Sequence, residues 1–105
     1  MDDLQIIELY FARDEHAIKE TDHKYGKLCF RVAKNLLFNN EDSEECVNDT
    51  YLTVWNKIPP TRPNNFTAFI CKITRNLSLK KLELLSVFSL LFCVLKLLTN
   101  LFVDF

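Results

Sequence analysis

Two stripes of polar side chains recur at helical spacing in this 105-residue sequence, and each could recognise a macromolecule. The acidic stripe has an apolar residue, Leu52, set among its members, which are Glu41, Glu44, Glu45, Asn48, Asp49 and Asn56. An acidic surface interrupted by an apolar residue suits a basic protein partner. The same pattern also suits a solvated helix face whose acids favour the helix N-terminus, and spacing alone leaves both interpretations open.

The basic stripe follows later in the chain and combines cations with an amide. Its members, related by steps of three and four residues, are Lys72, Arg75, Asn76 and Lys80, and Lys57 and Arg62 extend the same basic block. Cations neutralise phosphates and an amide can read base edges, so the stripe could bind nucleic acid. Loop and helix together could also hold an unstacked base. The alternative is a soluble helix face with cations near the helix end.

Residues for enzymatic chemistry are poorly placed in this sequence. His16 and His23 lie seven residues apart on one expected helix, with no cysteine or carboxylate set at metal-ligand spacing. The sequence has no glycine-rich phosphate loop and no nucleophile elbow. We therefore expect a protein that is not an enzyme, has no catalytic or metal-ligating residues and needs no cofactor.

The composition indicates that helices position both stripes. Apolar residues make up 49% of the chain and charged residues 26%, with one Gly and three Pro, which excludes collagen-like, low-complexity and disordered classes. The net charge of −1 is a cancellation, because residues 1–56 carry twelve acidic and six basic side chains whereas residues 57–83 carry one and six. An acidic part of the chain is therefore followed by a basic part.

Hydrophobic periodicity predicts an all-α protein, with a small bundle of about four helices in residues 1–83 and an apolar C-terminal helix in residues 84–105. The first helix is expected at Leu4–Ala12 and the second at Asp14–Phe38. Gly26 lies inside the second helix, where it could mark a kink or a break.

The third and fourth helices are bounded by capping residues and prolines. Asp42 and Glu45 resemble a capping box that opens the third helix. Pro59–Asn65 must be a loop, because proline lacks a donor and clashes with a preceding turn, and Asn65 is expected to cap the fourth helix. The expected buried residues are Cys46, Val47, Thr50, Tyr51, Val54, Trp55 and Ile58, then Phe66, Phe69, Ile70, Ile73 and Leu77.

The cysteines and the N-terminus favour a cytoplasmic protein. Successive cysteines (Cys29, Cys46, Cys71 and Cys93) are 17, 25 and 22 residues apart, which fits neither a zinc knuckle nor a redox dithiol. The start of the chain is acidic where a signal peptide is basic, and no apolar segment follows it. We expect reduced, mostly buried thiols.

Leu84–Phe105 is the candidate membrane segment of the sequence. Twenty-two helical residues would span roughly 33 Å, enough to cross a hydrocarbon core. Lys96 in its middle costs about 2.5–3.5 kcal/mol on insertion scales. Eight Leu, four Phe and three Val could offset that cost. The tail could instead pack as an apolar helix or be no evolved segment.

Two long motifs of this chain form a distinctive pair. The first reads Asp42-Ser-Glu-Glu-Cys-Val-Asn-Asp-Thr-Tyr-Leu-Thr-Val-Trp55, and the second reads Asn65-Phe-Thr-Ala-Phe-Ile-Cys-Lys-Ile-Thr-Arg-Asn-Leu-Ser-Leu-Lys-Lys-Leu82. Together they resemble region 2 of the sigma-70 family of RNA polymerase sigma factors, most closely the extracytoplasmic-function type. The usual sequence pattern of that type is D-x-E-D-L-V-Q-E-x-F-L-x-V-W, followed by F-x-A-W-L-Y-R-I-A-R-N-L-x-L-D-x-L. The likeness covers about residues 4–83.

The resemblance implies a non-catalytic module that directs the RNA polymerase core to promoters in transcription initiation. In the family the third helix docks on the clamp helices of the β′ subunit, which maps onto Glu45, Asn48, Asp49 and Leu52. Asn48 replaces the usual Gln, which shortens its reach by one methylene. The family's loop and fourth helix recognise and open the promoter −10 element, which maps onto Arg62, Asn64, Lys72, Arg75, Asn76 and Lys80. An anti-sigma factor is a further candidate partner.

The resemblance stops after Glu83. Family members continue with a polar linker and region 4, whose helix-turn-helix binds the −35 element, and nothing here resembles it. We expect residues 84–105 to come from a truncated or frame-shifted version of a longer gene, with a membrane anchor or a packed extra helix as alternatives. Two other functions also stay open: a stand-alone DNA-binding regulatory module without polymerase binding, and a small membrane-associated protein organised by the tail.

Overall fold

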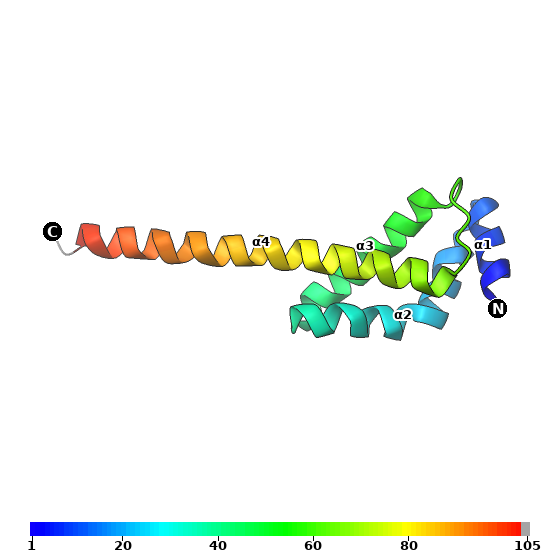
Figure 1. Ribbon diagram of the computed structural model, residues 1–105, viewed down its shortest axis with the longest axis horizontal. Helices are drawn as coiled ribbons and strands as arrows, with labels where there is room; N and C mark the ends of the chain where they lie inside the picture. The colour runs from blue at the N-terminus through cyan, green and yellow to red at the C-terminus, as the bar shows by residue number, and fades with distance from the viewer. Residues whose placement is uncertain (104–105) are drawn as a thin grey trace.

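The computed structural model describes residues 1–103, which form four helices. In chain order they are α1 (Asp3–Phe11), α2 (His16–Leu37), α3 (Asn40–Lys57) and α4 (Phe66–Val103). The first three helices and the beginning of α4 make a bundle, from which the rest of α4 projects as one long helix (Figure 1). No strand occurs within residues 1–103, and the predicted all-α fold is confirmed.

The start of α3 differs from the prediction. Asn39 is the N-cap, and its Oδ1 accepts the backbone N–H of Asp42 at 2.9 Å. The predicted capping box of Asp42 and Glu45 is therefore wrong, and Asp42 lies instead in the first turn, where its charge complements the helix dipole. Glu45 is consequently free of a capping role.

Two other helix starts follow side-chain capping rules. Asp2 caps α1 by accepting the N–H of Gln5 at 2.8 Å, and the Gln5 side chain accepts the N–H of Asp2 at 3.1 Å. This reciprocal pair is a capping box, which the sequence analysis missed. Asn65 caps α4 as predicted, because its Oδ1 accepts the N–H of Ala68 at 3.0 Å.

Gly26 lies inside α2 without interrupting it. A Cβ at this position would come within 2.7 Å of Asp22 Oδ1 and 3.2 Å of the Tyr51 hydroxyl oxygen. Tyr51 donates a hydrogen bond of 2.6 Å to Asp22 Oδ1, which ties α3 to α2. The expected break is absent from α2, and the lack of a side chain at Gly26 leaves room for the close approach of Asp22 and Tyr51.

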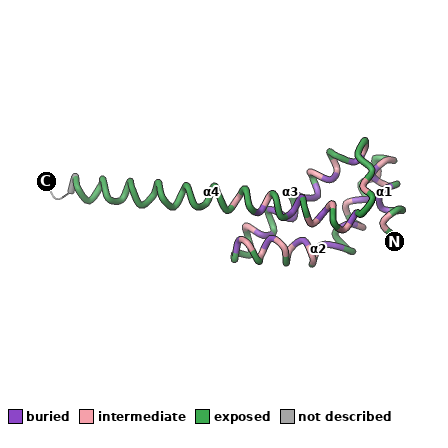
Figure 2. Tube along the Cα trace, viewed as in Figure 1, coloured by how far each residue is buried: buried purple, intermediate pink, exposed green. Residues whose placement is uncertain are grey.

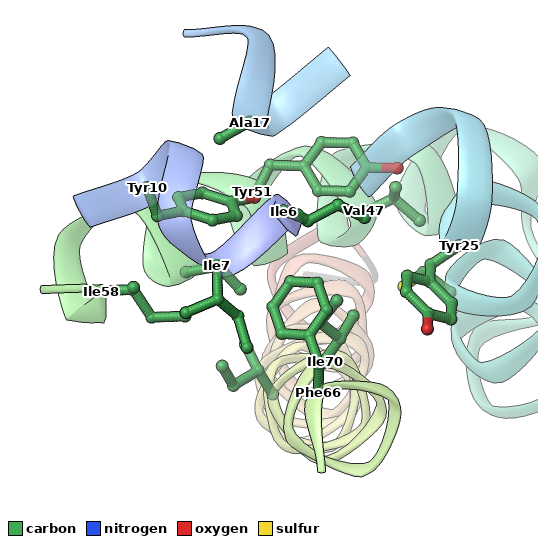
Figure 3. Packing of buried hydrophobic residues seen from close by; sticks show 13 residues of the cluster. Ile6, Ile7, Tyr10, Ala17, Tyr25, Val47, Tyr51, Ile58, Phe66 and Ile70 are labelled. Carbon is green, nitrogen blue, oxygen red and sulfur yellow. The ribbon is translucent and has the colours of Figure 1, made fainter. Parts of the chain in front are cut away.

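The core forms where all four helices meet. The Phe66 ring of α4 packs edge-on against Tyr10 and Tyr25, with ring centroids 6.2 and 5.8 Å apart (Figure 3). The predicted stripes of α3 and α4 supply much of the core, with Trp55, Phe69 and Leu77 half-buried at its edge. The buried cluster comprises Ile6, Ile7, Tyr10, Ala17, Tyr25, Cys29, Val47, Tyr51, Val54, Ile58, Phe66, Ile70 and Ile73.

Arg13 joins the first two helices to the far end of α3. Its Nη1 donates to the backbone carbonyls of Trp55 and Ile58, each at 2.8 Å. The guanidinium carbon also lies 3.7 Å from the centroid of the Trp55 ring, a cation–π arrangement. This clamp fixes the α1–α2 connection on the bundle.

Burial ends abruptly along α4. Lys81 is half-buried, and every residue from 82 to 101 is exposed (Figure 2). The extension of α4, residues 84–103, is helical as predicted. Leu84 and Phe88 border a groove beside α3, but every residue from 84 to 101 is exposed, so the extension is not a packed extra helix of the core. The division of the chain at residues 83 and 84 stays a prediction.

The four thiols are free and lie in different surroundings. Cys29 and Cys46 are buried, and this burial raises the pKa of both thiols. Cys71 is half-buried in the bundle, whereas Cys93 is exposed on the extension. The expected burial therefore holds for two of the four.

Candidate protein and nucleic-acid interfaces

The predicted acidic stripe lies on one exposed side of α3. Glu45, Asn48, Asp49 and Leu52 follow steps of three and four residues, so they are neighbours on the helix surface. The Leu52 side chain is 59% exposed although it is apolar. The opposite side of α3 is buried against α2 and α4, which fixes the stripe outward on a rigid element.

Hollows lie on both sides of this stripe. On the α2 side, a hollow of about 620 Å³ is lined by Asn48 and Leu52 together with Ile18, Asp22 and Trp55. The other hollow, of about 320 Å³, lies between α3 and α4. Its lining includes Glu45, Asp49, Lys80, Lys81, Leu84 and Phe88. The stripe is thus a ridge between an α2-side and an α4-side groove.

Lys81 partly neutralises the acidic stripe. Its ammonium group donates a hydrogen bond to the Glu45 carboxylate and lies 3.5 Å from Asp42 Oδ1. The bond to Glu45 raises the pKa of Lys81, against the smaller opposing effect of partial burial. A cationic partner that binds Glu45 must therefore compete with Lys81. The sequence did not predict this contact, because Glu45 and Lys81 are 36 residues apart in the chain and meet only where α3 and α4 cross.

The predicted basic stripe is exposed on α4. Lys72, Arg75, Asn76 and Lys80 all face solvent, while Ile73, Thr74 and Ser78 between them are buried in the bundle. Within residues 1–103, none of the three cations forms an ion pair with a carboxylate. The structure therefore brings these four side chains together as a surface whose positive charge is available to an anionic ligand.

The two loop residues predicted to accompany this stripe are placed differently. Arg62 donates from Nη1 to Glu8 Oε1 at 2.5 Å, and its guanidinium carbon lies 4.1 Å from the Phe11 ring centroid. It therefore engages α1, and an anionic ligand would have to draw it away from Glu8. Asn64 is exposed beside the capping residue Asn65.

A buried hydroxyl pair fixes the acidic and basic stripes relative to each other. The hydroxyl oxygens of Thr50 on α3 and Thr74 on α4 lie 3.0 Å apart in the core. Each hydroxyl has one proton, so one threonine donates to the other, and the accepting threonine donates to a carbonyl of its own helix, Cys46 for Thr50 or Ile70 for Thr74. The contact sets the register of the two helices that carry the stripes.

The histidines lie away from both stripes. His16 Nδ1 is 2.9 Å from Asp14 Oδ1 at the start of α2, and His23 is exposed. In the part of the chain that the structure describes, no group of three or more His, Cys, Asp or Glu side chains could hold a metal ion. The arrangement of residues on this bundle is suited to binding through charged surfaces.

Comparison with known proteins assigns the bundle to a family. Residues 22–83 match the family model of Sigma-70 region 2, which takes in most of α2, all of α3 and the packed part of α4. No curated protein and no solved structure matched the chain. Members of the matched family are sigma factors, which bind RNA polymerase and DNA in transcription initiation. Because the match covers more than half of the sequence, the chain belongs to the sigma-70 region 2 family.

Proposed function

We propose that this chain acts as a sigma region 2 module of the extracytoplasmic-function type, which docks on the β′ clamp helices and contacts the promoter −10 element. The observation that carries the proposal is the pair of exposed stripes of different charge on α3 and α4. Because both helices belong to one bundle with a fixed register, a polymerase bound to one stripe would hold DNA near the other.

The polymerase contact is assigned to the ridge on α3. Leu52 would supply an apolar anchor, and Asn48 and Asp49 would supply polar contacts around it. Glu45 would exchange its bond to Lys81 for a cation of the clamp helices. A regulatory anti-sigma protein that covered this ridge would prevent docking.

The promoter contact is assigned to the exposed side of α4. Lys72 and Lys80 would pair with phosphates, which positions the module without reading sequence. Arg75 and Asn76 carry donor and acceptor groups that can read exposed base edges. Arg62 and Asn64 in the preceding loop would join after Arg62 leaves Glu8.

A pull-down with isolated β′ clamp helices tests the polymerase contact. We expect Glu45→Ala/Asp49→Ala to weaken binding by at least about tenfold, or ~1.4 kcal/mol. Glu20→Ala/Glu83→Ala removes the same charge outside the acidic stripe and should bind like wild type. Lys81→Met breaks the bond to Glu45 but keeps both carboxylates, and it should bind at least as well as wild type. If Glu45→Ala/Asp49→Ala bound the clamp helices as tightly as wild type, the proposed docking on β′ would be rejected.

Binding of single-stranded −10 DNA to the chain with polymerase core tests the promoter contact. Lys72→Ala should weaken binding to all sequences and lower the salt dependence by about one phosphate contact. Arg75→Ala and Asn76→Ala should instead reduce the preference for −10 sequence over scrambled DNA. Lys27→Ala on α2 is the matched exposed control. DNA binding that is equally strong without polymerase would favour the stand-alone module.

A further inference from the structure

The extension of α4 is not used by the proposed function, and most of its circumference is apolar. It contains an 18-residue window with a mean hydropathy of 2.1, and no residue of that window is buried. Leu90, Leu91 and Phe92 are 68%, 55% and 69% exposed. Successive residues are about 100° apart around a helix, so these three point to three sides. One partner helix covers only a stripe, so it would leave much of this surface in water.

The length of the extension matches a membrane. Residues 84–103 are helical throughout, which corresponds to about 30 Å at 1.5 Å per residue. The hydrocarbon core of a bilayer is also about 30 Å thick. We propose that residues 84–103 insert into a lipid bilayer as a membrane-spanning helix that anchors the folded bundle to the membrane surface.

The polar side chains of the extension are compatible with this environment. Thr99 donates its hydroxyl to the Leu95 carbonyl at 2.8 Å, so the donor is satisfied within the helix. Lys96 is about 10 Å along the axis from the end of the segment, and its long side chain can extend part of the way toward the far headgroups. The small and polar residues share one side at steps of three and four, and they are Ser86, Ser89, Cys93, Lys96 and Asn100. The remaining circumference is apolar.

The charges beside the extension fit the lipid headgroups. Lys80 and Lys81 lie four and three residues before Leu84, and residues 57–83 carry six basic side chains and one acidic one. Basic residues near the end of a spanning helix attract anionic lipids and hold their side of the protein in the cytoplasm. The bundle would therefore face the compartment in which a sigma factor binds polymerase and DNA.

Flotation of the full chain with vesicles tests the insertion. The chain is synthesised with vesicles of phosphatidylethanolamine and phosphatidylglycerol, washed with alkaline carbonate and floated. Wild type should float, and Leu91→Asp/Leu95→Asp should reduce the floated fraction by about tenfold or more. Leu4→Asp/Leu52→Asp is the matched control, because these leucines of the bundle are at least as exposed, and it should float like wild type.

The reactivity of Cys93 supplies a second measurement on the unmutated chain. Cys93 is exposed and lies about 14 Å along the helix from Leu84, near the middle of the proposed span. A membrane-impermeant maleimide should label it at least about tenfold more slowly in vesicles than in detergent. The proposal would be overturned if carbonate released the chain from the vesicles, or if Cys93 were labelled equally fast in vesicles and in detergent. It would also be overturned if the chain stayed in solution as an oligomer.

Discussion

The two parts of α4 form one unbroken helix but have opposite relations to the rest of the molecule. From Phe66 to Lys81, buried residues recur every three or four positions and pack against α2 and α3. From residue 82 to 101, every residue is exposed although most are apolar. No turn or cap separates the two parts. The comparison shows that the bundle ends beside the α2–α3 connection, where α2 ends and α3 begins, and not where α4 ends.

The largest expected difference between the two parts concerns truncation of a phenylalanine. Phe66→Ala should lower the free energy of unfolding of the bundle by about 3–5 kcal/mol, because it leaves a cavity between Tyr10 and Tyr25. Phe88→Ala removes the same atoms from a side chain that is 71% exposed, and it should change that free energy by less than about 0.5 kcal/mol.

Urea unfolding followed by the fluorescence of Trp55 measures this difference. Trp55 is the single tryptophan, and its ring packs 6.1 Å from Tyr10 in the bundle, so it reports the unfolding of that part. The measurement is made on the full chain in vesicles. A loss of stability in Phe88→Ala comparable with that in Phe66→Ala would mean that the extension packs on the bundle.

The next prediction concerns the cation inside the extension. Lys96→Leu should favour membrane insertion by up to about 3 kcal/mol, because it removes the one basic side chain from the span. The stability of the bundle should not change. An apparent insertion free energy measured in a microsomal insertion assay checks this, with Lys72→Leu in the packed part of α4 as the control. An unchanged insertion free energy in Lys96→Leu would contradict a spanning position.

The fold was largely predictable because periodicity carries most of the information. The buried positions of α3 and α4 recur at the helical repeat, and Asn65 and the prolines mark the boundary between these helices. Two local errors have physical reasons. Asn39 caps α3 although Asp42 has the better-known pattern, and Gly26 permits the Tyr51–Asp22 contact without breaking α2. Both depend on neighbours that a single helix does not reveal.

The candidate surfaces were predictable as sets of residues, but their internal contacts were not. The spacing placed the acidic stripe of α3 and the basic stripe of α4 on exposed sides. The bond of Lys81 to Glu45, the bond of Arg62 to Glu8 and the clamp made by Arg13 each join residues more than 35 positions apart. Such partners follow from helix crossing, which the sequence pattern does not specify.

The smallest expected effect concerns Lys81, the last partly buried cation before the extension. Lys81→Met should lower the free energy of unfolding by about 0.5–1 kcal/mol at neutral pH, because Asp42 and Glu45 lose a shared partner near the surface. Lys96→Met, which changes the same side chain in the extension, should leave that free energy unchanged.

The pH dependence of the free energy of unfolding, compared between wild type and Lys81→Met, distinguishes loss of the Lys81 charge from loss of its packing. Because folding raises the pKa of Lys81 above 10.5, its ion pairs contribute fully below that value and are lost as the pH rises through the folded pKa. The stability difference between wild type and Lys81→Met should therefore be constant near neutrality and shrink above about pH 10.5. Urea unfolding across this range measures it. A difference that persists at the highest pH would assign the effect to the methylenes of Lys81, and the junction between the two parts of α4 would then be held by packing and not by charge.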